Sequence, residues 1–206
     1  MIMKKKRGTL FVISGPAGSG KGTVVKELIS AHDEIALSVS ATTRQPRPGE
    51  VHGVHYFYIS REEFEKRIAD GDILEYTTYR DNLYGTPLKE VKRALNKGKD
   101  IILEIEVDGA MQVKRRIRGS VAIMLTPPDY ETLERRLRGR GTEKEEDILW
   151  RLERAKAEIK LVDRYDYSVI NEDGRAKECA ELIYNIIKAE HQKTKNTKKE
   201  LIKKFI

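Results

Sequence analysis

A glycine-rich segment follows directly after a short apolar run near the start of the chain, and this pair limits the fold more than any other feature. The apolar run is Leu10-Phe11-Val12-Ile13, and the segment is Gly15-Pro16-Ala17-Gly18-Ser19-Gly20-Lys21-Gly22-Thr23. Glycines allow backbone N–H groups to curl around phosphate oxygens without a side-chain clash. A helix after the loop points its positive end at the same oxygens, and the lysine adds a full charge. We therefore predict a strand, a phosphate-binding loop and a helix that together hold a nucleoside triphosphate.

The segment matches the pattern G-x-x-x-x-G-K, with one departure. Gly22 stands where a Ser or Thr usually follows the lysine, and Thr23 comes one residue later. The prediction of a phosphate-binding loop is therefore better supported than the prediction that Thr23 is a ligand of Mg²⁺. On this evidence alone, adenylate, cytidylate and guanylate kinases, GTPases and motor ATPases all remain open.

Composition and cysteine usage indicate a soluble protein of the reducing cytoplasm. The chain has 206 residues, of which 35% are charged and 39% hydrophobic, which suits one α/β domain with an insertion. The lone cysteine, Cys179, allows no intrachain disulfide and falls in a helical apolar pattern, so we expect a packed thiol. No apolar run approaches the ~20 residues that span a bilayer, so we expect no membrane contact.

The net charge of +7 is unevenly distributed. Residues 188–206 contain seven Lys and two Glu and carry +5 of it, which leaves the folded part close to balance. We predict a solvated basic extension over residues 191–206. Weak contact with a polyanion is the alternative, and no specific nucleic-acid binding is expected.

Buried strands alternate with helices along most of the chain. The apolar patterns predict strands over 9–14, 35–40, 100–107, 121–125 and 166–170. They predict helices over 22–32, 86–97, 110–118, 128–138, 142–162 and 174–190, with Thr142 and Glu145 forming a capping box. This alternation is typical of a parallel sheet with helices on both faces.

The middle of the first half departs from this rhythm and resembles an inserted lobe. Its patterns predict strands over 54–59 and 73–79, and a helix that begins with a Ser60/Glu63 capping box and ends at Gly71. Arg44 and Arg47 offer forked donors for a second phosphate, and Tyr56 adds a hydroxyl.

A carboxylate in the same lobe adds base selectivity. Glu75 can accept two hydrogen bonds from the N1–H and N2–H₂ edge of guanine. Adenine lacks that donor pair and would leave the carboxylate unpaired.

The run Thr42-Thr43-Arg44-x-x-Arg47-x-x-Glu50-x-x-Gly53-x-x-Tyr56-x-Tyr58-Ile59 resembles the guanylate kinase family. Later blocks have the expected order: Tyr84-Gly85-Thr86, Leu103-Glu104-Ile105-Glu106, Arg136-Leu137-Arg138-Gly139-Arg140-Gly141-Thr142 and Val169-Ile170-Asn171-Glu172-Asp173. The resemblance covers roughly residues 8–190. It implies an α/β fold with a P-loop core (1–37 and 88–190), an inserted GMP-binding lobe (38–87) and a helical lid (about 126–158).

The resemblance also assigns roles to residues. Gly15–Thr23 with Lys21 would hold the ATP phosphates, and Asn171 would lie near the adenine. The lid arginines that close over the transferring phosphoryl group would be Arg136, Arg140 and Arg151. The GMP phosphate would meet Arg44, Arg47, Tyr56 and Tyr84. The guanine would meet Ser40, Glu75, Thr86 and Glu106.

Three positions depart from the common family pattern. Thr86 replaces the more usual Ser, Glu106 the more usual Asp, and Asp108 stands where Gln is common. The hydroxyl and the acceptor chemistry are kept, so these departures affect fine geometry around guanine and magnesium rather than the reaction class.

The expected activity is transfer of the γ-phosphoryl group of ATP to GMP and dGMP, giving GDP and ADP with Mg²⁺, in purine nucleotide metabolism. Lys21, Arg44, Arg136, Arg140 and Arg151 would be the catalytic cations. A monomer or small homo-oligomer is expected. The alternatives are another nucleoside monophosphate kinase, a non-catalytic guanylate-kinase-like binding module, and a nucleic-acid binder that uses the tail.

Overall fold

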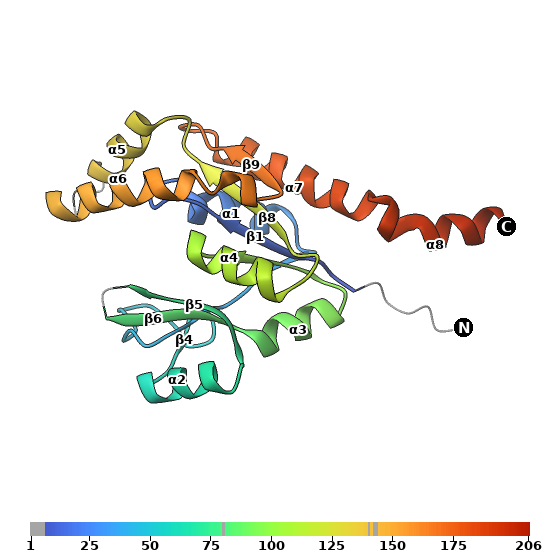
Figure 1. The fold of residues 1–206 in the computed structure, drawn as a ribbon, viewed down its shortest axis with the longest axis horizontal. Coiled ribbons are helices and arrows are strands. Elements are labelled where there is room, and N and C mark those ends of the chain that lie inside the picture. The colour runs from blue at the N-terminus through green and yellow to red at the C-terminus, as the bar shows by residue number, and fades with distance from the viewer. Residues whose placement is uncertain (1–6, 80, 140, 142–143) are drawn as a thin grey trace.

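A five-stranded parallel sheet forms the centre of the chain in the computed structural model, which describes residues 7–206 apart from 80, 140 and 142–143 (Figure 1). The strand order is β2-β7-β1-β8-β9, and each neighbouring pair runs parallel. The strands are β1 (Leu10–Ser14), β2 (Ile35–Leu37), β7 (Asp100–Glu104), β8 (Val121–Thr126) and β9 (Tyr167–Ile170). This order brings the carboxyl ends of β1 and β7 side by side, and the glycine-rich loop follows β1.

Helices cover both faces of this sheet because successive side chains of a strand point to opposite faces. Phe11 and Ile13 pack in the cluster that includes residues of α1 (Lys21–Ala31) and α7 (Ala176–Gln192). Leu10 and Val12 pack in a second cluster with residues of α3 (Leu88–Asn96) and α4 (Val107–Arg116). Both clusters are buried, which confirms the predicted parallel sheet between two helical layers.

A second sheet of four strands interrupts the chain between β2 and α3. Its order is β4-β3-β6-β5, antiparallel except for the β3/β4 pair. Its strands are β3 (Ala41–Thr42), β4 (Phe57–Tyr58), β5 (Ile73–Tyr79) and β6 (Asn82–Pro87), and α2 (Arg61–Ala69) packs on them. Figure 1 shows α4 between the two sheets, and Leu74 of β5 joins the buried cluster around α4.

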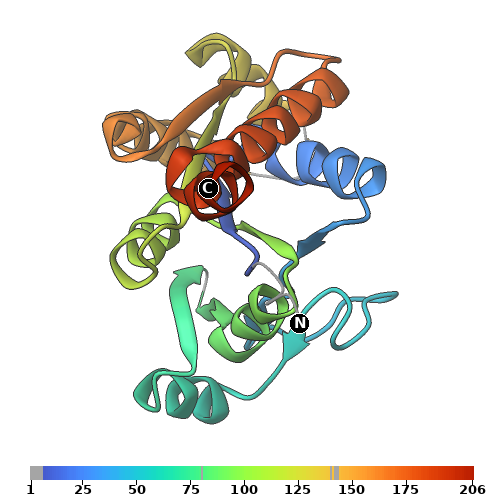
Figure 2. The same cartoon turned by 90° about the vertical axis from the view of Figure 1, so that its right-hand side faces the viewer.

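Two helices form a third unit above the glycine-rich loop. They are α5 (Tyr130–Arg138) and α6 (Glu145–Ile159), followed by the short 3₁₀ helix η1 (Val162–Arg164). Leu133, Leu137, Ile148 and Leu152 pack between the two helices, and Ala17 of the loop packs against them. In Figure 2 the second sheet lies at the bottom and the α5–α6 unit lies towards the upper left, and Arg151 of α6 contacts Tyr79 of β5.

The helix that was expected to start at Ser60 is confirmed together with its cap. The Ser60 hydroxyl accepts the N–H of Glu63 at 3.2 Å, and α2 follows. The second expected capping box falls partly on Thr142, which lies outside the described residues. Helix α6 begins at Glu145 with Lys144 at the N-cap position.

Three details of the inserted lobe were predicted wrongly, and the first is that strand β3 was missed. The strand expected over 54–59 is only Phe57–Tyr58, because Val54 and His55 turn back and donate their N–H groups to the Val51 carbonyl. Strand β6 was missed, and Thr86 and Pro87 lie at its end rather than inside α3. β6 is central in its sheet and pairs with β3 and β5, so its short mixed sequence is stabilised by neighbours that are distant in the chain.

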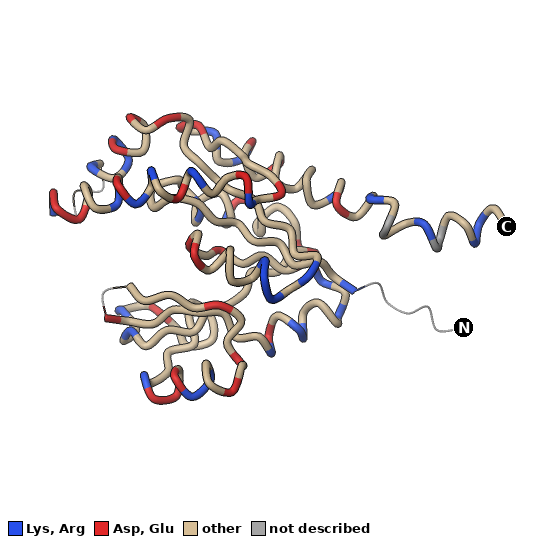
Figure 3. The backbone as a smooth tube through the Cα atoms, viewed as in Figure 1, with Lys and Arg blue, Asp and Glu red and all other residues tan. Residues whose placement is uncertain are grey.

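The basic extension is helical, which the prediction lacked. Helix α8 (Thr194–Phe205) follows α7, and the Asn196 side chain donates to the Glu190 carbonyl at 2.8 Å. Figures 1 and 3 show α8 projecting from the body, with basic positions along it. Lysine, leucine and glutamate favour helix, so a solvated Lys-rich segment need not be irregular. Across the described parts of the chain, no helix has both the length and the apolar character needed to cross a bilayer.

Candidate functional site

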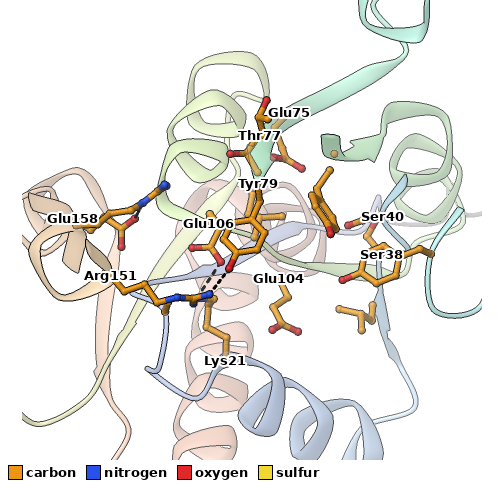
Figure 4. A pocket seen from close by; sticks show the side chains of 18 of the residues that line it. Lys21, Ser38, Ser40, Glu75, Thr77, Tyr79, Glu104, Glu106, Arg151 and Glu158 are labelled. Carbon is orange, nitrogen blue, oxygen red and sulfur yellow. Dashed lines mark hydrogen bonds and ion pairs between the residues drawn. The ribbon is translucent and has the colours of Figure 1, made fainter. Parts of the chain in front are cut away.

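A cleft of about 460 Å³ opens where the glycine-rich loop, the second sheet and the α5–α6 unit meet (Figure 4). Residues from all three units line it, together with the end of β7. The lining residues are Ala17, Lys21, Leu37, Ser38, Ser40, His55, Tyr56, Glu75, Thr77, Thr78, Tyr79, Tyr84, Gly85, Glu104, Ile105, Glu106, Trp150, Arg151, Arg154 and Glu158. Several predicted site residues, far apart in the sequence, therefore share one cavity.

The glycine-rich loop takes the shape that a phosphate cradle requires. Gly18 and Gly20 have φ of 93° and 89°, which favour glycine. At Gly15 a Cβ would lie 2.0 Å from the Leu125 carbonyl oxygen, so no larger residue fits. Lys21 Nζ donates to the Gly15 carbonyl at 2.6 Å, and its side chain points into the cleft (Figure 4). Thr23 is exposed on the first turn of α1.

Two carboxylates flank Lys21 at the carboxyl end of β7. Glu106 Oε1 lies 3.7 Å from Lys21 Nζ, and a Cβ at Gly22 would lie 3.4 Å from Glu104 Oε1. Burial raises the pKa of Glu104, Lys21 opposes that shift, and the charge of Glu106 adds to it. Carboxylate oxygens beside a phosphate cradle are the donor type that Mg²⁺ prefers. No group of three or more metal-binding side chains occurs among the residues described, so a cation here would need further oxygens from phosphate or water.

Glu75 lines the end of the cleft that faces away from Lys21 (Figure 4). Its side chain is 2% exposed, and Thr86 Oγ1 donates to its Oε1 at 2.6 Å. Burial raises the pKa of Glu75 to about 7, while the hydrogen bonds from Thr86 work in the opposite direction. A buried carboxylate that keeps one oxygen for an incoming donor can discriminate strongly against a base without that donor.

The two predicted phosphate arginines lie together on the loop after β3. Arg44 Nη2 pairs with Glu50 Oε1 at 2.9 Å, and the Arg47 backbone N–H donates to Glu50 Oε2 at 2.7 Å. The Arg44 side chain, the Arg47 backbone and the hydroxyl of Tyr58 hold the pKa of Glu50 down to about 2. Neither arginine is among the described residues that line the cleft, and the Arg47 side chain is exposed.

Tyr56, Tyr84 and Ser40 line the cleft next to this loop. The rings of Tyr56 and Tyr84 pack edge to face with centroids 6.0 Å apart, and burial raises the pKa of Tyr56. The Arg44 guanidinium lies 5.6 Å from the centre of the Tyr56 ring. Tyr56 and Tyr84 therefore connect the loop that carries Arg44 to the wall of the cleft.

The predicted lid arginines are placed differently from one another. Arg151 lines the cleft, donates to the hydroxyl of Tyr79 and stacks 5.5 Å from its ring centre. It thus joins α6 to β5 across the opening, as the dashed line in Figure 4 shows. Arg136 instead donates to the Asn171 carbonyl and to Asp173, both at 2.8 Å. Arg140 lies outside the described residues.

Asn171 is buried against the glycine-rich loop. Its Nδ2 donates to the Ser19 carbonyl at 2.8 Å, and a Cβ at Gly20 would lie 2.3 Å from that nitrogen. Its Oδ1 is buried without a hydrogen-bond partner among the described atoms. Asn171 does not line the described cleft, so its expected place near the adenine stays a prediction.

Several cleft residues were missed by sequence reasoning, chiefly Glu104, Arg154 and Glu158. Arg154 Nε donates to Glu158 Oε1 at 2.7 Å, and its Nη2 reaches Asp108 Oδ2 at 3.1 Å. The sequence contained a pattern that could have identified two of these three residues. Arg154 lies three residues after Arg151 and therefore shares its helix face, and Glu104 is a charged residue at the end of a buried strand.

Comparison with known proteins gives a consistent result. Residues 7–190 match the family model described as guanylate kinase. The chain is 49% identical over 200 residues to a guanylate kinase of Clostridioides difficile (strain 630), covering 97% of both chains. It is 54% identical over 187 residues to a guanylate kinase of Streptococcus agalactiae serotype III, covering 90% of this chain and 88% of that one.

A solved structure has the same fold. The crystal structure of guanylate kinase from Anaplasma phagocytophilum superposes with a TM-score of 0.72 at 34% identity. The match covers 92% of this chain and 89% of that one.

Proposed function

The chain belongs to the guanylate kinase family, and we propose that the cleft described above is where it phosphorylates GMP to GDP with ATP. One observation supports this assignment above the others. The Lys21 side chain of the glycine-rich loop and the buried Glu75 carboxylate face the same cleft from opposite ends. That arrangement can hold a triphosphate at one end and a guanine base at the other, so that the two phosphates meet between them.

The residues of this chain would act mainly by alignment and charge. Phosphoryl transfer asks for little covalent chemistry from the protein, because the acceptor phosphate oxygen is already anionic near neutral pH. We assign Lys21 and Gly15–Thr23 to the ATP phosphates, with Arg136, Arg140 and Arg151 as further cations. Arg44, Arg47, Tyr56 and Tyr84 would bind the acceptor phosphate, and Ser40, Glu75, Thr86 and Glu106 the guanine. The division into core, GMP-binding lobe and lid follows these roles.

The contact between Arg151 and Tyr79 supports a lid role for α6. It joins the α5–α6 unit to β5 over the cleft. Closure there would exclude water and limit hydrolysis of ATP.

Mg²⁺ fits the donor set beside Lys21. Glu104 and Glu106 would supply hard oxygen ligands beside Lys21, directly or through water, and the hydroxyl of Thr23 on the first turn of α1 is proposed as a further ligand. When bound with ATP, the ion supplies positive charge that neutralises the phosphate oxygens.

A coupled assay of ADP production tests the proposal. The protein is supplied with ATP and Mg²⁺ and with GMP, dGMP, AMP, CMP or UMP in turn. We expect rapid turnover with GMP, slower or equal turnover with dGMP, and at most ~1% of that rate with the others, the discrimination expected of a hydrogen-bonding site. Equal turnover with AMP would overturn the role of Glu75, and GMP binding without turnover would indicate a binding module.

The remaining expectations concern the setting of the reaction. Cys179 is a buried thiol, and burial raises its pKa to about 11, which fits the packed thiol that was expected. We propose the cytoplasm as the location of the protein. There the product GDP would enter purine nucleotide metabolism. We expect a monomer or small homo-oligomer, which sedimentation of the purified chain would decide.

A further inference from the structure

Glu75 occupies an irregularity in β5. The pairing of β5 with β6 shifts by one residue between Ile73 and Tyr76, so Leu74 and Glu75 together lie opposite Thr86. Ile73, Leu74 and Glu75 are all buried, whereas a regular strand would alternate. A bulge of this kind changes the direction of a side chain, so the place of the Glu75 carboxylate depends on what holds the bulge.

Gln112 of α4 holds the strand just after Glu75. β5 lies at the edge of its sheet, and within the part of the chain that the structure describes its outer backbone groups have no strand neighbour. The Gln112 Nε2 donates to the Tyr76 carbonyl at 2.8 Å, and the Tyr76 N–H donates to Gln112 Oε1 at 3.1 Å. The side-chain amide thus offers one donor and one acceptor, as a residue of an additional strand would.

Arg116, one turn further along α4, holds the strand just before Glu75. Its Nη1 donates to the Ile73 carbonyl and to the Leu74 carbonyl, both at 2.6 Å. These are charge-assisted hydrogen bonds to the two backbone carbonyls that directly precede Glu75. Gln112 and Arg116 therefore bracket Glu75 from the same helix.

Gly109 completes this helix face. A Cβ at Gly109 would lie 2.4 Å from Glu75 Oε2, so the carboxylate rests against a position where no side chain fits. Gly109, Gln112 and Arg116 are three and four residues apart, which places them on one stripe of α4. Because α4 starts directly after Glu106, this stripe connects the end of β7 with the second sheet.

We propose that Gln112 and Arg116 are positioning residues for base selectivity: they hold the β5 bulge and thereby set where the Glu75 carboxylate meets the purine. Gly109 leaves the room that this position needs. The inference rests on the proposed function, since it concerns the acceptor nucleotide of that same site.

Gln112→Met and Arg116→Met test the proposal. Methionine nearly matches the size of glutamine and keeps the aliphatic stem of arginine, and each variant removes the hydrogen bonds of the original side chain. Turnover is measured with GMP and with inosine monophosphate, which lacks the 2-amino donor. We expect the KM for GMP to rise about tenfold or more and the preference for GMP over inosine monophosphate to fall at least ~5-fold. The KM for ATP and the kcat at saturating GMP should change less than ~3-fold. A merely structural role would not move the preference between the two acceptors.

Two matched variants serve as controls. Arg115→Met removes the exposed neighbour of Arg116 on the same helix, and Gln192→Met removes an exposed glutamine in the last turn of α7. Neither should change the preference. Gln112→Glu is a milder variant that keeps the acceptor for the Tyr76 N–H and loses the donor to the Tyr76 carbonyl. We expect it to lose part of the preference for GMP over inosine monophosphate. If Gln112→Met does not fold, this variant tests the positioning role of Gln112 in its place.

The outcomes separate this inference from the proposed function. If the unmodified protein phosphorylates GMP and the folded variants keep its preference, the positioning role is wrong and the function stands. If the unmodified protein neither binds nor phosphorylates GMP, the proposed function fails and the inference fails with it.

Discussion

At the scale of single residues, the site depends on groups whose chemistry is set by burial and by close neighbours. Lys21 is held by the Gly15 and Pro16 carbonyls at the mouth of the loop, with Glu106 nearby. Glu75 is enclosed, and among the described residues its side-chain donor is Thr86. Lys21 yields a prediction that separates binding from turnover, and Glu75 yields predictions for GMP binding and for stability.

Replacing Lys21 with Met should abolish most of the turnover while the acceptor still binds. The charge acts on phosphate oxygens whose negative charge develops during transfer, so kcat should fall by about 10²–10³. Steady-state kinetics and GMP titration calorimetry measure the two effects. Lys26→Met, at an exposed position of the same helix, is the control and should keep its activity. Near-full turnover of Lys21→Met would contradict the assigned role.

The raised pKa of Glu75 predicts a pH dependence of GMP binding. The carboxylate must be ionised to accept from guanine, and its pKa in the folded protein is about 7. GMP affinity should therefore increase from pH 6 to pH 8. In Glu75→Gln this part of the dependence should vanish, and the affinity should be low throughout. Any pH dependence that the variant retains belongs to other groups, including the GMP phosphate.

The same pKa has a consequence for stability. The folded-state value lies above the ordinary 4.5, so the folded protein binds the proton more tightly, and stability falls as pH rises from about 4.5 to about 7. The shift corresponds to about 3 kcal/mol at alkaline pH. Glu75→Gln should therefore unfold at a higher temperature than the unmodified protein at pH 8, with a smaller difference at pH 5. An equal difference at both pH values would contradict the buried, ionisable environment.

At the scale of elements, hydrogen bonds at the start of a helix and at the edge of a strand stabilise the elements around the site. Helix α2 is capped locally by Ser60, whereas β5 is completed at its edge by the side chains of α4. The first arrangement depends on neighbours in sequence and the second on packing between units.

Ser60→Ala should lower the free energy of unfolding by about 1 kcal/mol, since α2 loses the acceptor for the Glu63 N–H. For a chain of this size the melting temperature should fall by roughly 2–4 °C. Thermal unfolding followed by circular dichroism measures the change, and Ser30→Ala on an exposed position of α1 is the matched control. The KM for GMP should stay within ~2-fold, because Ser60 is not among the described cleft residues. An unchanged melting temperature would show that the cap contributes nothing.

At the scale of the whole molecule, three units meet at one cleft, and Trp150 reports on their approach. It is the single tryptophan of the chain, lines the cleft from α6 and is 55% exposed, with the Arg154 guanidinium 5.4 Å from its ring centre. If α6 closes over bound nucleotides, the ring loses water contact. Adding GMP and ATP together should shift its emission to shorter wavelength. CMP should have no effect, and a constant spectrum at saturating GMP and ATP would contradict closure at α6.

The sequence by itself determined the parts whose causes are local. The glycine-rich loop follows from the backbone freedom of Gly18 and Gly20, the α2 start from Ser60, and the order of strands and helices from apolar periodicity. Glu75 could be proposed as a guanine reader because a carboxylate can accept hydrogen bonds from the N1–H and N2–H₂ edge of guanine, and that role stays a prediction. The loop conformation and the start of α2 depend on residues within one or two turns of each other.

Only the tertiary structure decided the features that depend on contacts between distant segments. Strand β6 exists because β3 and β5 flank it, and the short strand over 57–58 is limited by the turn at Val51. The bracketing of Glu75 by Gln112 and Arg116 joins residues more than thirty positions apart. Pairing and side-chain contacts of this kind become favourable only after the intervening chain has closed, and no local pattern encodes which segments will then meet.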